Sequence, residues 1–296
     1  MYEARPINSI DKKTSVDVSD EDIHWNHKND YAEFLSLDIF LSLQERQWIG
    51  KHDELMFVVV HQISELWIKL LIDELTYLRD TYLRNDDLAH CAPTLERIRS
   101  IQQQLINCWE VAVTLEPVKY LEFRETDGFK GSSGFQSYQY RMLEFILGNK
   151  NEILIKSQEN KPKIQEQLID VLNKPSLYDE VLALLSRWGK DVPKEILDRD
   201  KSGPYEHSNE VESVWYEIYK RYRENWDLYR LGETLVDIEY HFQKWRFHHL
   251  KTVERLIGTR RGTGGSSGVG YLVKALDITF FPELLTVRTR LGEDFD

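Results

Sequence analysis

The sequence has little cysteine, no excess of positive charge and no long unbroken apolar run. Its 296 residues include only Cys91 and Cys108, which are too few for a disulfide framework and too far apart to form a thiol metal site. A net charge of −12 disfavours nucleic acid and anionic membrane surfaces as partners. No apolar run approaches the roughly 18 to 20 residues of a membrane span, and the polar N-terminus lacks a signal-peptide core. We therefore expect a cytoplasmic protein with no nucleic-acid and no membrane partner.

Helical periodicity dominates what is present. Residues 1–28 are polar and acidic without a sustained period, which predicts a mobile N-terminal arm. Residues 29–296 are predicted to form a single all-α domain, a bundle of long helices. The expected helices cover residues 31–44, 53–79, 95–116, 117–124, 137–148 and 217–258. Gly148 is expected to end one helix in the left-handed conformation, and Gly232 marks a possible kink in the longest helix.

Glycine is concentrated in two short segments. Nine of the 15 glycines lie in DGFKGSSG, residues 127–134, and GTRRGTGGSSGVG, residues 258–270. Flexible linkers are one interpretation of such composition. Both segments run directly into apolar helical sequence, however, which favours two loops that pack at a functional site.

Two groups of histidines lie on the strongest helices. His61 follows the apolar run FVVV, and Phe57 lies four residues earlier on the same face. A single buried histidine is more often a core residue than a ligand. His241, His248 and His249 lie on an aromatic-rich helix, where a histidine can serve as the axial ligand of haem, join a metal cluster or belong to an amphipathic surface. His248 and His249 point about 100° apart, so a pocket accommodates one of them.

Other metal and nucleotide sites fit the sequence less well. A carboxylate-bridged iron pair in a helical bundle needs Glu-x-x-His pairs, and the predicted helices contain none. The second glycine segment lacks the Gly-Lys-Ser/Thr ending and the preceding strand of a phosphate-binding loop. A single haem needs one axial histidine and an apolar slot with aromatic walls, which this sequence supplies. No nucleophilic Ser/His/Asp or Cys/His arrangement is legible.

One helix and one glycine segment carry residues suited to an amino acid. Tyr120 and Arg124 are four residues apart in PVKYLEFR and share a face, so that the arginine could grip a carboxylate and the tyrosine could donate a further hydrogen bond. A surface arginine beside a tyrosine is the simpler reading of that pair alone. Thr263 could present its hydroxyl to the amino-acid end of a ligand in an aromatic-lined cavity.

Several long segments resemble the tryptophan 2,3-dioxygenase family. They are HDELMFVVVHQISELWIKLL, SSGFQSYQYRMLEFILGNK, LVDIEYHFQKWRFHHLKTVERLIGTRRGTGGSSGVGYL and FFPELLTVRTRLG, within a resemblance that runs from about Tyr31 to the C-terminus. The resemblance implies an all-α, cytosolic homotetramer that binds haem b and uses O2 to open the indole ring of L-tryptophan, giving N-formylkynurenine.

The resemblance also implies roles for individual residues. His249 corresponds to the proximal ligand of the haem iron, and His61 to the distal histidine that contacts the indole N–H. It assigns Phe57, Tyr120, Arg124 and Thr263 to the substrate pocket, and Trp109, Ser133 and Gly134 to the haem side. In the family, the segment of Tyr31, Phe34 and Leu35 reaches into the pocket of a neighbouring subunit.

Two positions depart from the family pattern. Phe34 stands where members usually carry a second tyrosine, so one hydroxyl is missing. The segment ETDGFKG, residues 125–131, is longer and more polar than the usual loop beside the pocket. This change keeps one alternative open: a related haem monooxygenase acting on tryptophan or a methylated tryptophan, giving a hydroxylated or 2-oxindole product. A second alternative, from another class of protein, is a helical haem or ligand carrier without turnover.

Overall fold

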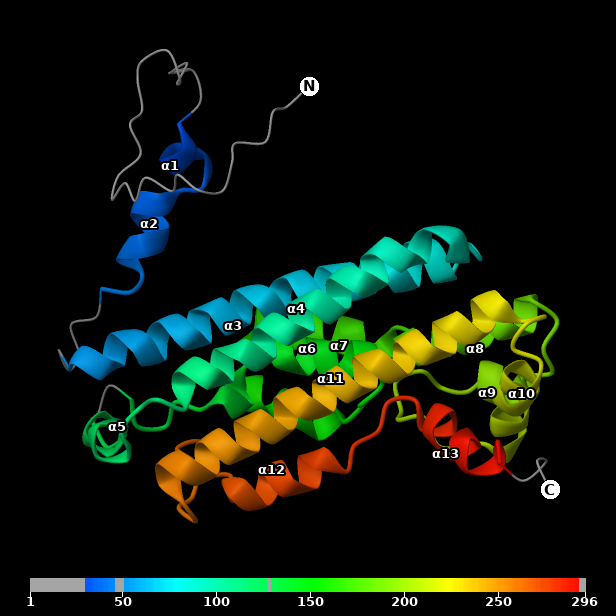
Figure 1. Cartoon of the computed structure of the whole chain (residues 1–296). Coiled ribbons are helices and arrows are strands. Elements are labelled where there is room, and N and C mark those ends of the chain that lie inside the picture. The colour runs from blue at the N-terminus through cyan, green and yellow to red at the C-terminus, as the bar shows by residue number, and fades with distance from the viewer. Residues whose placement is uncertain (1–29, 46–50, 127–128, 293–296) are drawn as a thin grey trace, which may run out of the picture. The chain divides into compact units, whose positions relative to one another are not determined.

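The computed structural model describes residues 30–45, 51–126 and 129–292 (Figure 1). Helices dominate these ranges and none of their residues is in a strand, which confirms the predicted all-α fold. The chain divides into two compact units, residues 1–45 and 46–296. The predicted arm over residues 1–28 and its boundary lie outside the described residues. Residues 30–45, which the sequence analysis joined to the catalytic domain, group with the N-terminal unit.

The described part of the N-terminal unit contains two short helices, α1 (Tyr31–Phe34) and α2 (Leu37–Ser42). The single helix expected over residues 31–44 is therefore wrong. Ser36 takes a left-handed conformation with φ of 51°, which separates α1 from α2. Neither helix buries a residue, although most of their side chains are apolar.

Three long helices form the centre of the second unit: α3 (His52–Tyr77), α4 (Cys91–Ala112) and α11 (Trp226–Ile257). Helix α4 packs against α3 and also against α11. One stripe of each helix is buried, with residues such as Leu71 and Leu75, Ile98 and Leu105, Leu235 and Ile238. The π-helical turn η1 (Leu78–Leu83) continues α3. The helices predicted for residues 53–79 and 95–116 are confirmed to within a few residues.

Shorter helices surround this centre. They are η2 (Leu88–His90), α5 (Pro117–Arg124), η3 (Gly134–Gln136), α6 (Tyr138–Leu147), η4 (Glu152–Gln158), α7 (Pro162–Asn173), α8 (Leu177–Arg187), α9 (Lys194–Leu197), α10 (Asn209–Lys220), α12 (Val269–Leu276) and α13 (Pro282–Arg290). Pro117 occupies the first turn of α5, and Gly148 ends α6 with φ of 121°, both as expected.

The stretch predicted as one helix over residues 217–258 is two helices. The chain breaks between α10 and α11, whereas α11 continues through Gly232 without interruption. Gly232 is required for close packing: a Cβ atom there would lie 3.1 Å from the Trp215 ring and 3.2 Å from the Tyr219 hydroxyl. The glycine therefore lets α10 approach α11 and does not act as a hinge.

One apolar helix needs separate mention. Among the described residues, the continuous helix His52–Leu83 is long and apolar enough to cross a membrane by length and composition alone. The core helix of a water-soluble protein can have the same length and composition, and this helix carries charged residues such as Glu65 and Lys69. Only 17% of its most apolar window is buried inside this chain, so much of that surface remains uncovered in one copy.

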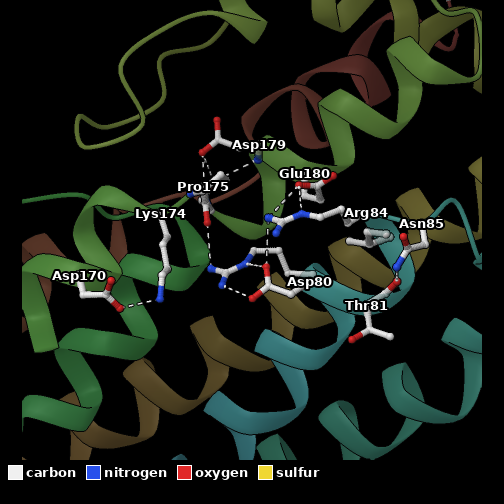
Figure 2. Close-up of polar contacts among 12 residues, drawn as sticks. Asp80, Thr81, Arg84, Asn85, Asp170, Lys174, Pro175, Asp179 and Glu180 are labelled. Atoms are coloured by element: carbon white, nitrogen blue, oxygen red, sulfur yellow. Dashed lines mark hydrogen bonds and ion pairs between the residues drawn. The ribbon is translucent and has the colours of Figure 1, made fainter.

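Charged side chains join η1 to the junction between α7 and α8 (Figure 2). Arg79 donates two 2.8 Å hydrogen bonds to Asp80 and one of 2.9 Å to the carbonyl of Pro175. The hydrogen bonds from Arg79 hold the pKa of Asp80 below its ordinary value. Arg84 reaches Glu180 of α8 at 3.4 Å. These contacts fix the far end of α3 against the rest of the bundle.

Lys150 caps the carboxyl end of α7. Its side chain is 4% exposed, and Nζ donates to the carbonyls of Leu172 and Lys174 at 2.7 and 2.6 Å and to that of Val171 at 3.1 Å. Burial lowers the pKa of Lys150 to about 8. The Leu172 and Lys174 carbonyl groups at this end of α7 thereby gain a donor, and the Val171 carbonyl accepts from both Lys150 and the amide of Lys174.

Lys150→Met should therefore lower the free energy of unfolding by about 2–4 kcal/mol, because it leaves buried carbonyls without a donor. Chemical denaturation followed by circular dichroism measures the change. Lys174→Met is the matched control: its exposed ion pair with Asp170 is worth at most about 0.5 kcal/mol. Equal losses in the two variants would contradict the capping role.

Candidate active site

His61 lies on α3 with its two ring nitrogens in different settings. Its Nδ1 is 2.7 Å from the carbonyl oxygen of Phe57, one turn earlier. Since a carbonyl can only accept, the proton is on Nδ1, and Nε2 carries an available lone pair. Burial lowers the pKa of His61, so the imidazole is neutral at neutral pH. His61 therefore presents a hydrogen-bond acceptor.

His249 lies on α11 against aromatic side chains. The Trp109 ring of α4 stacks on it with a centroid distance of 4.6 Å and an interplanar angle of 9°, and the Trp245 ring lies at 5.7 Å. Burial lowers the pKa of His249 to about 4. Within the described residues no hydrogen bond engages its ring nitrogens. A neutral, unengaged imidazole is the form that ligates a metal.

The two histidines belong to one site. After burial, the nearby His61 imidazole is the next cause of the lowered pKa of His249, so the rings from α3 and α11 lie close enough to interact electrostatically. No three His, Cys, Asp or Glu side chains in residues 30–45, 51–126 and 129–292 are grouped to hold a metal ion. A metal held here by a histidine must bring most of its ligands with it, as the iron of a porphyrin does.

The neighbouring histidines are engaged elsewhere. Nδ1 of His248 lies 3.3 Å from the carboxylate of Glu110 of α4. His241 bonds through Nδ1 to the carbonyl of Asp237 at 2.8 Å and is partly buried. Of the histidines on α11, His249 is thus the one that faces His61, which agrees with the angular argument from the sequence.

Four aromatic rings gather beside His61. The Phe57 ring lies 4.1 Å from the His61 ring, and it contacts Tyr120 and Phe123 of α5 at 5.8 and 5.5 Å between centroids. Phe129, which follows α5 in the altered loop, approaches Phe57 at 5.3 Å and Phe123 at 5.7 Å, edge to face. These rings make one wall of the site apolar.

Arg124 is the charged group beside this wall. It follows Tyr120 by one turn of α5, and its side chain is 7% exposed. One N–H donates to the carbonyl of Arg261 in the second glycine loop. Its Nη1 lies 3.4 Å from the exposed carboxylate of Glu125. A guanidinium has five N–H donors, so the donors outside the Arg261 bond can bind an anion.

The two glycine segments touch each other and do not behave as separate linkers. The Thr263 hydroxyl donates to the carbonyl of Ser132. A Cβ atom on Gly264 would lie 2.7 Å from Cβ of Ser133, so only glycine permits this approach. Gly131 and Gly265 have φ of 87° and 85°. Ser133 caps η3 by accepting from the amide of Phe135 at 3.3 Å, with Gly134 as the first residue of that turn.

The site contains buried polar groups that suit a haem. The indole nitrogens of Trp109 and Trp245 are buried without a hydrogen-bond partner, and both indoles adjoin His249. Buried N–H groups without partners are costly, so they favour a bound group that offers acceptors, as the carboxylates of haem do. With a neutral histidine and aromatic walls, the residues present fit a haem.

The structure brings together His61, His249, Phe57 and Trp109. It also brings α5, which carries Tyr120 and Arg124, into contact with the glycine loop that contains Thr263. That loop in turn contacts the loop that contains Ser133 and Gly134. Tyr31, Phe34 and Leu35 lie in the N-terminal unit, and their side chains are exposed. Sequence reasoning missed Trp245 and Phe129. The spacing of Trp245, four residues before His249, is a signal that could have revealed it. Phe129 had no comparable signal because it lies in an irregular loop.

Comparison with known proteins agrees with this geometry. A family model described as tryptophan 2,3-dioxygenase matches residues 15–176 and 158–291. Proteins named tryptophan 2,3-dioxygenase from Bacillus cereus and Serratia proteamaculans are 45% and 47% identical to this chain, over 95% and 88% of it and 100% and 93% of their own lengths. One from Erythrobacter litoralis is 48% identical over 88% of the chain and 98% of its own length. These names favour the dioxygenase over the monooxygenase and the carrier. The chain belongs to the tryptophan 2,3-dioxygenase family.

Proposed function

We propose that this chain binds haem b through His249 and uses O2 to cleave the C2–C3 bond of the indole ring of L-tryptophan, giving N-formylkynurenine. The observation that carries the proposal is the pair of neutral, interacting histidines from α3 and α11, beside an aromatic wall that includes Tyr120 and adjoins Arg124. Names of relatives at 45–48% identity supply the reaction class.

The cofactor and the protein divide the task. Bound haem supplies the iron chemistry that activates O2 toward an electron-rich indole. His249 would hold the haem iron, and the flat stack of Trp109 on its ring holds the imidazole in one orientation. Ser133 and Gly134 line the haem side of the site. Both oxygen atoms enter the product, so the reaction itself consumes no external reductant.

The remaining residues bind and orient tryptophan. Nε2 of His61 accepts the indole N–H, because Nδ1 is engaged with Phe57. Arg124 pairs with the substrate carboxylate, which replaces the exposed Glu125 carboxylate. Tyr120 and the hydroxyl of Thr263 assist at the amino-acid end. Phe57 and its neighbouring rings cover the indole and exclude water from the reacting bond.

We also infer a homotetramer in the cytoplasm. Tyr31, Phe34 and Leu35 are 73%, 86% and 41% exposed, and apolar side chains so exposed favour burial against another copy. There they would reach the pocket of the neighbouring subunit. Cys91 and Cys108 are free thiols, which suits a reducing compartment. A monomer by native mass spectrometry, or activity confined to a secreted fraction, would contradict this inference.

The reaction is tested by product identification. Haem-loaded protein is reduced without air, mixed with L-tryptophan and exposed to isotopically labelled O2. We expect N-formylkynurenine carrying two labelled oxygen atoms. A product with one labelled atom and an intact ring would instead support the monooxygenase, and O2 binding without turnover would support the carrier.

His249→Ala should yield folded protein that lacks the Soret absorption of haem after purification, because the iron loses its protein ligand. His248→Ala removes the adjacent histidine, which pairs with Glu110, and should retain haem. Absorption spectra and pyridine haemochrome assays measure the difference. Normal haem content in His249→Ala would refute the axial assignment.

Arg124→Met should lower kcat/KM for L-tryptophan by about 30-fold or more, since a buried charge pair lost to truncation costs roughly 2–5 kcal/mol. Tryptamine has the same indole but no carboxylate. Its kcat/KM should change little between wild type and variant. Equal losses for both substrates would mean that Arg124 acts on the fold and not on the carboxylate.

His61→Ala should keep the haem and lower kcat/KM for L-tryptophan by about 5- to 100-fold, because the indole N–H loses its acceptor. His241→Ala is the matched control, since its Nδ1 makes the same bond to the preceding turn on α11. 1-Methyltryptophan has no N–H to donate. The assignment fails if that analogue loses as much as L-tryptophan does on removal of His61.

A further inference from the structure

We propose that Phe129 is a specificity-determining residue that limits which substituents the benzene ring of the indole can carry. This inference rests on the proposed function. Phe129 belongs to the segment of residues 125–131, which departs from the family pattern in length and polarity.

The Phe129 ring lies among the aromatic rings beside His61. It contacts Phe57 at 5.3 Å, Phe123 at 5.7 Å and Tyr120 at 6.4 Å between centroids, each edge to face. Phe57 in turn lies 4.1 Å from His61. Phe129 is therefore one ring away from the group that accepts the indole N–H.

The four rings differ in how exposed they are. Phe123 is 1% exposed and forms the base of the cluster. Phe57, Tyr120 and Phe129 are only partly buried, so they present the free surface of the cluster. Phe57 and Tyr120 are anchored on helices that carry His61 and Arg124. Of these three rings, Phe129 is the one that comes from a loop.

Backbone hydrogen bonds hold Phe129 in place. Its amide donates to the carbonyl of Thr126 at 3.0 Å, and its carbonyl accepts from the amide of Ser132 at 2.9 Å. The Ser132 carbonyl then accepts from the hydroxyl of Thr263. Hydrogen bonds to Thr126 and from Ser132 thus anchor the backbone groups of Phe129, and Ser132 is itself bonded to the other glycine loop. A ring anchored in this way can set the size of a pocket.

The chemistry follows from these three points. A tryptophan held at its N–H by His61 and at its carboxylate by Arg124 has only its benzene ring free to meet an apolar wall. A rigid aromatic wall rejects an added methyl group because overpacking has no room to relax. Removing the wall should admit that group, and one methyl group in an apolar pocket changes kcat/KM by about 10- to 200-fold.

The test compares wild type with Phe129→Ala, Phe129→Leu and the control Lys130→Ala, whose side chain is exposed in the same loop. Each protein is loaded with haem and assayed with L-tryptophan and with tryptophans that carry one methyl group at each benzene carbon in turn. We expect the ratio of kcat/KM for at least one methylated substrate to that for L-tryptophan to rise about ten-fold or more in Phe129→Ala. The rise should be smaller in Phe129→Leu and absent in Lys130→Ala.

Equilibrium titration of the same tryptophans into the ferric proteins should give the same order of preference. If Phe129 only anchors the loop to the aromatic cluster, its replacement lowers kcat/KM by the same factor for every substrate. The ratios between substrates then stay at their wild-type values, and this result would overturn the inference. Phe129→Leu keeps the apolar volume and guards against misfolding of the alanine variant. Wild-type protein that makes no N-formylkynurenine would instead contradict the proposed function.

Discussion

The site depends on keeping two imidazoles neutral in a space that excludes water. His61 and His249 both have lowered pKa values because burial penalises their charged forms, and the nearby His61 lowers the pKa of His249 further. In the proposed roles, a charged His249 could not ligate iron, and a charged His61 could not accept a hydrogen bond from the indole N–H. The apolar helices α3, α4 and α11 therefore contribute to chemistry through their dielectric environment as well as through packing.

The second requirement is a rigid arrangement of irregular backbone around those histidines. Arg124 at the end of α5 is tied to the carbonyl of Arg261, and Thr263 is tied to that of Ser132. Gly264 permits the two loops to touch. Functional groups on loops need this kind of support, because misplacement by about 1 Å can cost roughly 100-fold in rate.

The aromatic cluster connects binding to selectivity. Phe57 contacts both the His61 ring and the aromatic rings of α5. Phe129 contacts the same cluster of rings from a loop whose sequence can vary without disturbing any helix. Variation in such a loop can change the accepted substrate while the reaction itself stays the same. The exposed apolar surfaces of α1, α2 and α3 favour the homotetramer proposed above, in which another copy of the chain would cover them.

Periodicity in the sequence was enough to predict an all-α fold and helices near α3, α4, α5 and α6, because amphipathic spacing is a local property. Long motifs were enough to indicate the family and to select His249 over His248. Only the tertiary structure decided that Gly232 is a packing contact, that Ser36 interrupts the first helix, and that Phe129 and Trp245 adjoin the site. Each of these depends on which surfaces meet between segments distant in the chain, and no local pattern records such meetings.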